Sequence, residues 1–160
     1  MSSTPSSTLT GQRQQYIDAL RRFPDQLEQF VLPLSDEELD KQFESEWTVR
    51  QIVHHLADSH MSANFRFKKP LTESRPDFMG YDQDAFALLG DYRLPIAPSL
   101  QLLRGLHERF VALLESLSEE DWQRTGLHSE WGEVTVEEVA QRYAEHGLNH
   151  LEQIDRVLKG

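Results

Sequence analysis

The chain has 160 residues, enough for one domain with an apolar core, and no cysteine, which excludes cysteine nucleophiles, thiolate metal sites and a disulfide framework. Its 27 acidic residues outnumber its 16 Lys and Arg residues, so the basic face of a nucleic-acid-binding protein is not expected. No apolar run is long enough to span a membrane, and segment 1–10 is rich in Ser and Thr without the features of a signal peptide. We therefore expect a cytoplasmic protein with a disordered tail, 1–10, before a single domain, 11–160.

Apolar residues recur with helical spacing in four long segments. These segments cover, in chain order, about residues 17–31, 48–70, 100–117 and 135–159. Pro24 is expected to kink the first helix and Pro70 to end the second, because proline lacks a backbone N–H and clashes with the preceding turn. Short helices are expected near 35–42 and 118–124, and no strand-like alternation is found. The pattern predicts an all-α protein.

Helix starts of one type recur along the chain. Each has Ser or Thr at the N-cap, an acidic residue or Gln three positions later, and apolar residues on either side. The copies are Ser35-Asp-Glu-Glu38, Thr48-Val-Arg-Gln51, Thr135-Val-Glu-Glu138 and, less regularly, Ser118-Glu-Glu-Asp121. The segment 70–97 between the second and third long helices is rich in Pro, Gly and Asp. A connection of this length is typical of a lid or of a crossover that leaves the two helices parallel.

Two histidines interrupt the apolar face of the fourth long helix. His146 and His150 are four residues apart, so they lie one turn apart on the same face, at positions where core residues are expected. They are either hydrogen-bonded structural histidines or ligands of one ion. A buried polar ring without a partner costs about 1–3 kcal/mol, and a shared metal ion would satisfy both rings.

The second long helix offers a third ligand. His54 and His55 are adjacent and point about 100° apart, so both cannot face the core. The face of His55 continues through Ser59, Ser62 and Arg66, a polar stripe beside an apolar one, as expected for the lining of a pocket. We therefore predict His55 as a metal ligand and the three polar residues as cofactor- or substrate-binding. Arg66 would hold a carboxylate or phosphate, or else form a surface salt bridge.

His107 lies on the apolar face of the third long helix. It is either a hydrogen-bonded packing residue or a catalytic residue that moves protons, whereas His60 and His128 are expected to be structural or exposed. Gly147 follows His146 where a zincin carries its catalytic glutamate, so no general base accompanies the histidine pair. The sequence also lacks the Glu-x-x-His of di-iron bundles.

The segments around these histidines resemble a known family. The runs Trp47-Thr-Val-Arg-Gln-Ile-Val-His-His-Leu-Ala-Asp-Ser-His60 and Tyr143-Ala-Glu-His-Gly-Leu-Asn-His150 closely resemble the DinB-like superfamily, in particular its YfiT branch. The resemblance extends over nearly the whole chain. It departs from the branch at Ser129-Glu130-Trp131, which replaces a Pro-containing segment, so substrate identity is not carried over.

This resemblance implies an up-down-down-up four-helix bundle. It also implies a zinc or nickel ion on His55, His146 and His150, in agreement with the spacing argument, and a homodimer. Members of the branch are described as metal-dependent hydrolases, and other relatives use thiols such as bacillithiol, mycothiol or glutathione.

Three function classes stay open at this point. Three protein ligands leave a coordination position free, which is typical of a catalytic site. The favoured hypothesis is a transferase that activates a low-molecular-weight thiol toward small electrophiles. The alternatives are a hydrolase that uses water, with His107 or a carboxylate such as Asp58 as base, and a non-catalytic metal- or small-molecule-binding module. The sequence does not identify the metal, the thiol or the substrate.

Overall fold

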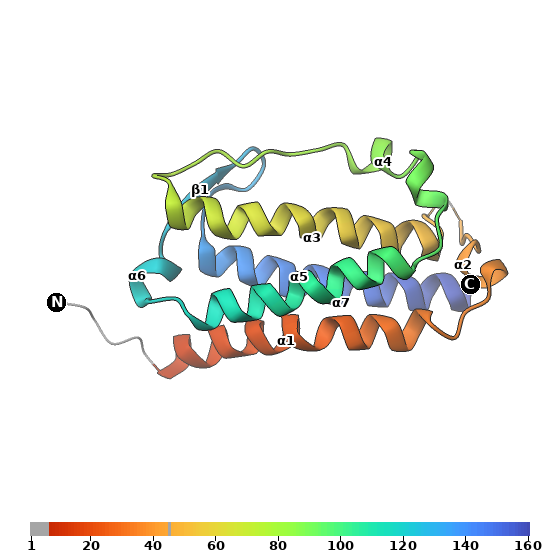
Figure 1. The fold of residues 1–160 in the computed structure, drawn as a ribbon, viewed down its shortest axis with the longest axis horizontal. Coiled ribbons are helices and arrows are strands. Elements are labelled where there is room, and N and C mark those ends of the chain that lie inside the picture. The colour runs from red at the N-terminus through yellow and green to blue at the C-terminus, as the bar shows by residue number, and fades with distance from the viewer. Residues whose placement is uncertain (1–6, 45) are drawn as a thin grey trace.

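Four long helices form the bundle in the computed structural model, which describes residues 7–44 and 46–160. They are α1 (Ser7–Val31), α3 (Val49–Thr72), α5 (Ala97–Glu115) and α7 (Val136–Lys159). α1 and α7 run in one direction and α3 and α5 in the other (Figure 1). α1 and α3 each pack against both α5 and α7. This arrangement confirms the predicted all-α, up-down-down-up four-helix bundle.

The helix starts follow the predicted capping pattern. Thr48 Oγ1 accepts the N–H of Gln51, and the Gln51 side chain accepts the N–H of Thr48, at 3.1 and 2.9 Å. Reciprocal boxes also begin the short helices α2 (Asp36–Leu39) and α6 (Glu119–Trp122). Helix α1 begins at Ser7, inside the expected tail, and residues 1–6 of that tail lie outside the described residues.

The connection from α3 to α5 carries the chain back along the bundle, so that these two helices are parallel (Figure 1). It contains α4 (Gln83–Phe86) and the 3-10 helix η1 (Gly90–Arg93). Pro70 does not end α3 as predicted, because the helix continues to Thr72 and the N–H of Glu73 still bonds to Lys69 O at 2.8 Å. α1 also continues through Pro24, and the kink expected there stays a prediction. None of the helices in the described ranges is long and apolar enough to cross a membrane.

A small hairpin contradicts the prediction that the chain has no strands. β1 (Thr125–His128) pairs antiparallel with β2 (Gly132–Thr135), and His128 lies opposite Gly132. Gly132 has a φ of 77°, which only glycine adopts readily, and it closes the three-residue loop 129–131. Each strand has only four residues, too few for an alternating pattern to stand out.

The apolar core is divided into two clusters along the bundle axis. One includes Leu27, Ile52 and Ile154, and the other includes Leu20, Phe67 and Val139. Between them, α3, α5 and α7 each place histidines in the interior rather than apolar residues. His60 and His107 are 0% and 1% exposed, respectively. The middle of the bundle is therefore a polar layer between two apolar clusters.

Candidate metal centre

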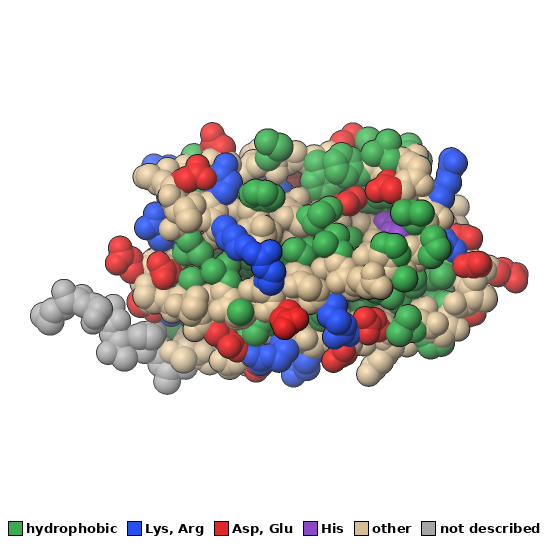
Figure 2. All heavy atoms as spheres, viewed as in Figure 1, with side chains coloured by type: hydrophobic (Ala, Val, Ile, Leu, Met, Phe, Trp, Pro, Cys, Tyr) green, Lys and Arg blue, Asp and Glu red, His purple; other side chains and the backbone are tan. Residues whose placement is uncertain are grey.

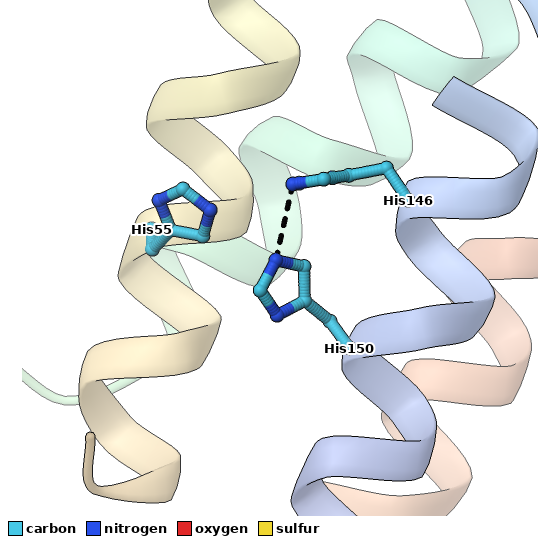
Figure 3. Close-up of side chains that lie close together, drawn as sticks. All are labelled: His55, His146 and His150. Carbon is cyan, nitrogen blue, oxygen red and sulfur yellow. Dashed lines mark hydrogen bonds between the residues drawn. The ribbon is translucent and has the colours of Figure 1, made fainter. Parts of the chain in front are cut away.

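Three histidines from two helices converge in this layer. His55 projects from α3, and His146 and His150 project from successive turns of α7 (Figure 3). One nitrogen of each ring lies within 4.8 Å of the others. The ring centroids of His146 and His150 are 4.4 Å apart, and the ring centroid of His55 is 4.9 Å from that of His150. The structure thus brings together the three residues that the sequence predicts as ligands.

His150 is held in one tautomer by its neighbours. Its Nδ1 lies 2.7 Å from Gln153 Oε1, an oxygen that can only accept, so Nδ1 carries the proton and Nε2 a free lone pair. The Gln153 amide in turn donates to Glu46, which is paired with Arg156. His150 Nε2 faces His146 Nε2 at 3.0 Å (Figure 3). Because His150 Nε2 carries a lone pair, His146 Nε2 either donates its proton to that lone pair or, as a second lone pair, shares a metal ion with it.

Buried nitrogens without partners support the metal ion. His146 Nδ1 and His55 Nδ1 are buried and have no hydrogen-bond partner among the described residues. If His146 binds a metal through Nε2, its proton lies on Nδ1. This single tautomer can therefore bind the metal with one nitrogen and donate a hydrogen bond with the other. Three imidazoles with converging nitrogens are a donor set that zinc and nickel favour. The residues therefore fit a divalent transition-metal ion.

The electrostatics of the cluster keep its rings neutral. Burial, followed by the proximity of His150, lowers the pKa of His55 and of His146 to about 3. Burial also lowers the pKa of His150, although the bond to Gln153 acts in the opposite direction. A neutral imidazole is the form that binds a metal, so these rings are ready to bind without first losing a proton.

His54 takes no part in this cluster. Its Nε2 donates to Leu94 O at 2.9 Å, and its Nδ1 accepts from Ser99 Oγ at 2.6 Å. Both ring nitrogens are therefore used to hold the start of α5 and the preceding residues against α3. His54 is a structural residue, and His55 is the member of the pair that faces the cluster.

A pocket of about 580 Å³ opens beside His146. Of the three residues predicted to bind a cofactor or substrate, Ser59 and Arg66 line it, whereas Ser62 lies in the neighbouring apolar cleft and bonds to its own helix. Arg66 is 8% exposed and donates to Tyr143 Oη at 2.7 Å, while its Nε is buried and has no partner among residues 7–44 and 46–160. Arg66 is therefore a buried cation whose Nε–H can still donate a hydrogen bond.

Sequence reasoning missed other residues that line this pocket. The hairpin loop contributes Trp131, and α7 contributes Arg142, whose guanidinium lies 4.2 Å from the centroid of the Trp131 ring. Tyr81 comes from the connection between α3 and α5, and burial raises its pKa to about 12. The departure from the family pattern at residues 129–131 was the one sequence signal that pointed to this wall.

His107, the predicted catalytic residue, does not line this pocket. Its Nδ1 lies 2.7 Å from Leu20 O and its Nε2 lies 2.6 Å from His60 Nδ1, so both ring nitrogens are hydrogen-bonded. Burial lowers its pKa to about 4. His60 stands between His107 and His146, with its ring centroid 4.8 and 5.6 Å from theirs. His60, which the sequence predicts to be structural or exposed, is fully buried and is a neighbour of the cluster.

Comparison with known proteins identifies the family. The model of the DinB superfamily matches residues 19–154, and the chain belongs to this superfamily. A protein of Oceanobacillus iheyensis named "Putative metal-dependent hydrolase" is 42% identical over 146 residues, which are 91% of this chain and 85% of the relative. A relative of the same name from Halalkalibacterium halodurans is 37% identical, over 96% of this chain and 91% of its own.

Solved structures show the same fold. YfiT from Bacillus subtilis, described as "a probable metal-dependent hydrolase with an unusual four-helix bundle topology", superposes with a TM-score of 0.89 at 35% identity, over 98% of this chain and 91% of its own. A variant of the mycothiol-dependent maleylpyruvate isomerase superposes with a TM-score of 0.71 at 12% identity, over 87% of this chain and 59% of its own. At that identity the second likeness concerns the fold alone.

Proposed function

We propose that this DinB superfamily protein is a metal-dependent enzyme that binds zinc or nickel through His55, His146 and His150 and transfers a low-molecular-weight thiol to small electrophiles. The observation that carries the metal centre is the convergence of three ring nitrogens within 4.8 Å, with His150 fixed as an Nε2 donor. When bound, such an ion supplies Lewis acidity that removes the proton from a coordinating thiol or water.

The described residues of the cluster include no general base, which favours a thiol over water as the nucleophile, although the carboxylate of Glu145 lines the adjoining pocket. No carboxylate belongs to the three-histidine group in the described part of the chain. Asp58, one base considered from sequence, accepts the hydroxyl of Tyr92 at 2.5 Å instead. His107 uses both nitrogens elsewhere. A thiol needs no protein base at a metal site, whereas attack by water usually benefits from one.

The pocket presents two guanidinium groups that would hold the carboxylates of a thiol such as glutathione or bacillithiol, and the carboxylates of Asp82, Glu130 and Glu145 line other parts of it. The Arg66 side chain lines the pocket and its buried Nε–H has no partner among the described residues, while Arg142 lies on the same wall over Trp131. A guanidinium in a partly desolvated pocket binds carboxylates strongly and with defined geometry. Arg66 and Ser59 would hold the carboxylates of the thiol next to His146, and the remaining volume would admit the electrophile.

The test is to assay zinc- and nickel-loaded protein with a bimane electrophile, with and without bacillithiol or glutathione. We expect metal-dependent conjugation only when the thiol is present. His146→Ala should abolish it, and Leu148→Ala, an exposed substitution on the same helix, should leave it unchanged. Absence of conjugation with every thiol would refute the transferase.

Hydrolysis is the second candidate, because the relatives and YfiT are named for it. The same preparations should be offered ester and amide substrates without any thiol. Metal-dependent turnover under those conditions would establish hydrolysis and remove the need for a thiol. Metal binding without turnover of either kind would leave a binding module.

The proposal also includes a cytoplasmic homodimer. Hydrophobic side chains reach the surface in several places on the face shown in Figure 2. Met61 and Phe65 on α3, at 41% and 65% exposure, adjoin Met79 of the connection at 89%. Burial of such side chains between two copies would stabilise a dimer. Sedimentation equilibrium of wild type and Phe65→Ser would test it, with a shift toward monomer expected for the variant.

A further inference from the structure

The proline inside α1 exposes a carbonyl that orients a histidine. In an uninterrupted helix, Leu20 O would accept the N–H of residue 24, but Pro24 has none. His107 Nδ1 lies 2.7 Å from this carbonyl. Because a carbonyl oxygen can only accept, His107 must carry its proton on Nδ1 and present a lone pair on Nε2.

The orientation of His107 fixes that of His60. His60 Nδ1 lies 2.6 Å from His107 Nε2, so His60 must donate from Nδ1. Its own lone pair then lies on Nε2, which is fully buried and has no partner among the described residues. This series of hydrogen bonds, from His60 through His107 to Leu20 O, therefore leaves His60 Nε2 as a hydrogen-bond acceptor in the interior of the bundle.

The neighbouring ring of His146 can supply a complementary donor. If His146 binds the metal ion through Nε2, its Nδ1 carries a proton, and this nitrogen is buried with no partner in the described part of the chain. The rings of His60 and His146 are 5.6 Å apart and inclined by 43°. No hydrogen bond joins His60 Nε2 and His146 Nδ1 among the described residues, and at this centroid separation a rotation that turns them toward each other would bring them near hydrogen-bonding distance. Metal-binding histidines almost always donate their second N–H to a protein acceptor.

We infer that His60 is a positioning residue for the metal centre, whose Nε2 accepts the Nδ1–H of His146 when the ion is bound. The inference rests on the proposed metal site. His146 would then be oriented through His60 and His107 by the carbonyl that Pro24 frees, just as His150 is oriented by Gln153. In this arrangement His107 acts through other residues and does not contact the substrate.

Nitrogen NMR of protein labelled with ¹⁵N-histidine tests the inference directly. In the metal-free wild type we expect His107 and His60 both to be protonated on Nδ1. Protonation of His60 on Nε2 would refute the hydrogen-bond series from His60 to Leu20 O. On zinc loading, a scalar coupling across an N–H···N bond should join His146 Nδ1 to His60 Nε2. Zinc binding without this coupling would overturn the role of His60. Failure to bind zinc would instead overturn the metal centre itself, while the metal-free tautomers would still report on the hydrogen-bond series.

Two variants at one position separate this role from packing. His60→Phe keeps the ring volume and removes the acceptor, and we expect zinc affinity to fall about 10- to 100-fold. His60→Gln can place an amide oxygen near the position of Nε2 and should restore much of that affinity. Thermal unfolding of the metal-free variants controls for stability. Equal zinc affinity in wild type and a folded His60→Phe would refute the inference, and if that variant fails to fold, the wild-type coupling decides.

Discussion

Two glycines in different helices should respond in opposite ways to the same substitution. Gly147 lies in α7 between His146 and His150, and a Cβ placed there would meet ring atoms of Phe23 at 2.8 and 2.9 Å. Gly105 lies in α5, where a Cβ would meet no atom of the described residues within 4 Å. Replacing glycine by alanine in a helix gains about 1 kcal/mol of stability when no clash occurs. Gly105→Ala should therefore stabilise the protein by about 0.5–1 kcal/mol.

The Gly147→Ala variant has to displace Phe23. That side chain is 3% exposed; its ring stacks on His60, with centroids 5.6 Å apart, and contacts the tilted ring of His107 at 5.2 Å, so it cannot move without disturbing the polar layer. Overpacking of this kind costs about 1–3 kcal/mol, which exceeds the gain in helix propensity. We expect Gly147→Ala to be less stable than wild type by up to about 2 kcal/mol.

Thermal unfolding of the metal-free proteins, followed by circular dichroism, measures both effects. For a chain of this size, about 1 kcal/mol corresponds to about 2–4 °C in Tm. Gly105→Ala should melt above wild type and Gly147→Ala below it. Combining Gly147→Ala with Phe23→Leu should cost less than the sum of the single changes, because the clashing ring atoms are gone. A Gly147→Ala protein as stable as Gly105→Ala would refute the packing argument.

Three further predictions concern the site. Alanine at any one of the three proposed ligands should abolish bound metal in elemental analysis while the bundle stays folded. His54→Ala should retain metal but melt at a lower temperature, because two hydrogen bonds are lost. Loss of metal in His54→Ala but not in His55→Ala would show that His54 is the ligand. Burial lowers the pKa of His55 and His146 below the value in the unfolded chain, about 6.5. The unfolded state therefore binds more protons than the folded state as pH falls. The free energy of unfolding of the metal-free protein should decrease by about 2 kcal/mol per ring between pH 7.5 and 5. Urea unfolding at the two pH values measures this loss, and equal stability would contradict it. Arg66→Met should raise KM for glutathione about 10- to 100-fold and leave the uncharged 2-mercaptoethanol unaffected in steady-state assays; equal effects on both thiols would argue against anion binding.

The helical architecture was predictable because its signals are local. Capping boxes such as that of Thr48 and Gln51 act within one helical turn, and apolar spacing reports which face of a helix is buried. The same local geometry placed His146 and His150 on one face of a helix. The polar stripe after His55 then distinguished it from His54, because the two rings had to face different surroundings.

Only the tertiary structure decided what depends on distant partners. The hairpin went unpredicted because its four-residue strands are specified by pairing with each other and with the α3–α5 connection, through Phe78 and Leu127. The position of Tyr81 and Trp131 in the pocket likewise depends on two connections that meet only in the folded chain.

His60 and His107 show most clearly the difference between what local sequence determines and what tertiary packing decides. The sequence marks Pro24 as a helix-disturbing residue, but the carbonyl that it frees meets His107 across 87 positions of the chain. The sequence by itself determined the helices, their buried faces and the histidines available to them. The packing of α1 against α5 and of α3 against α7 decided which ring nitrogens meet, because hydrogen bonds between helices depend on distances that no local pattern encodes.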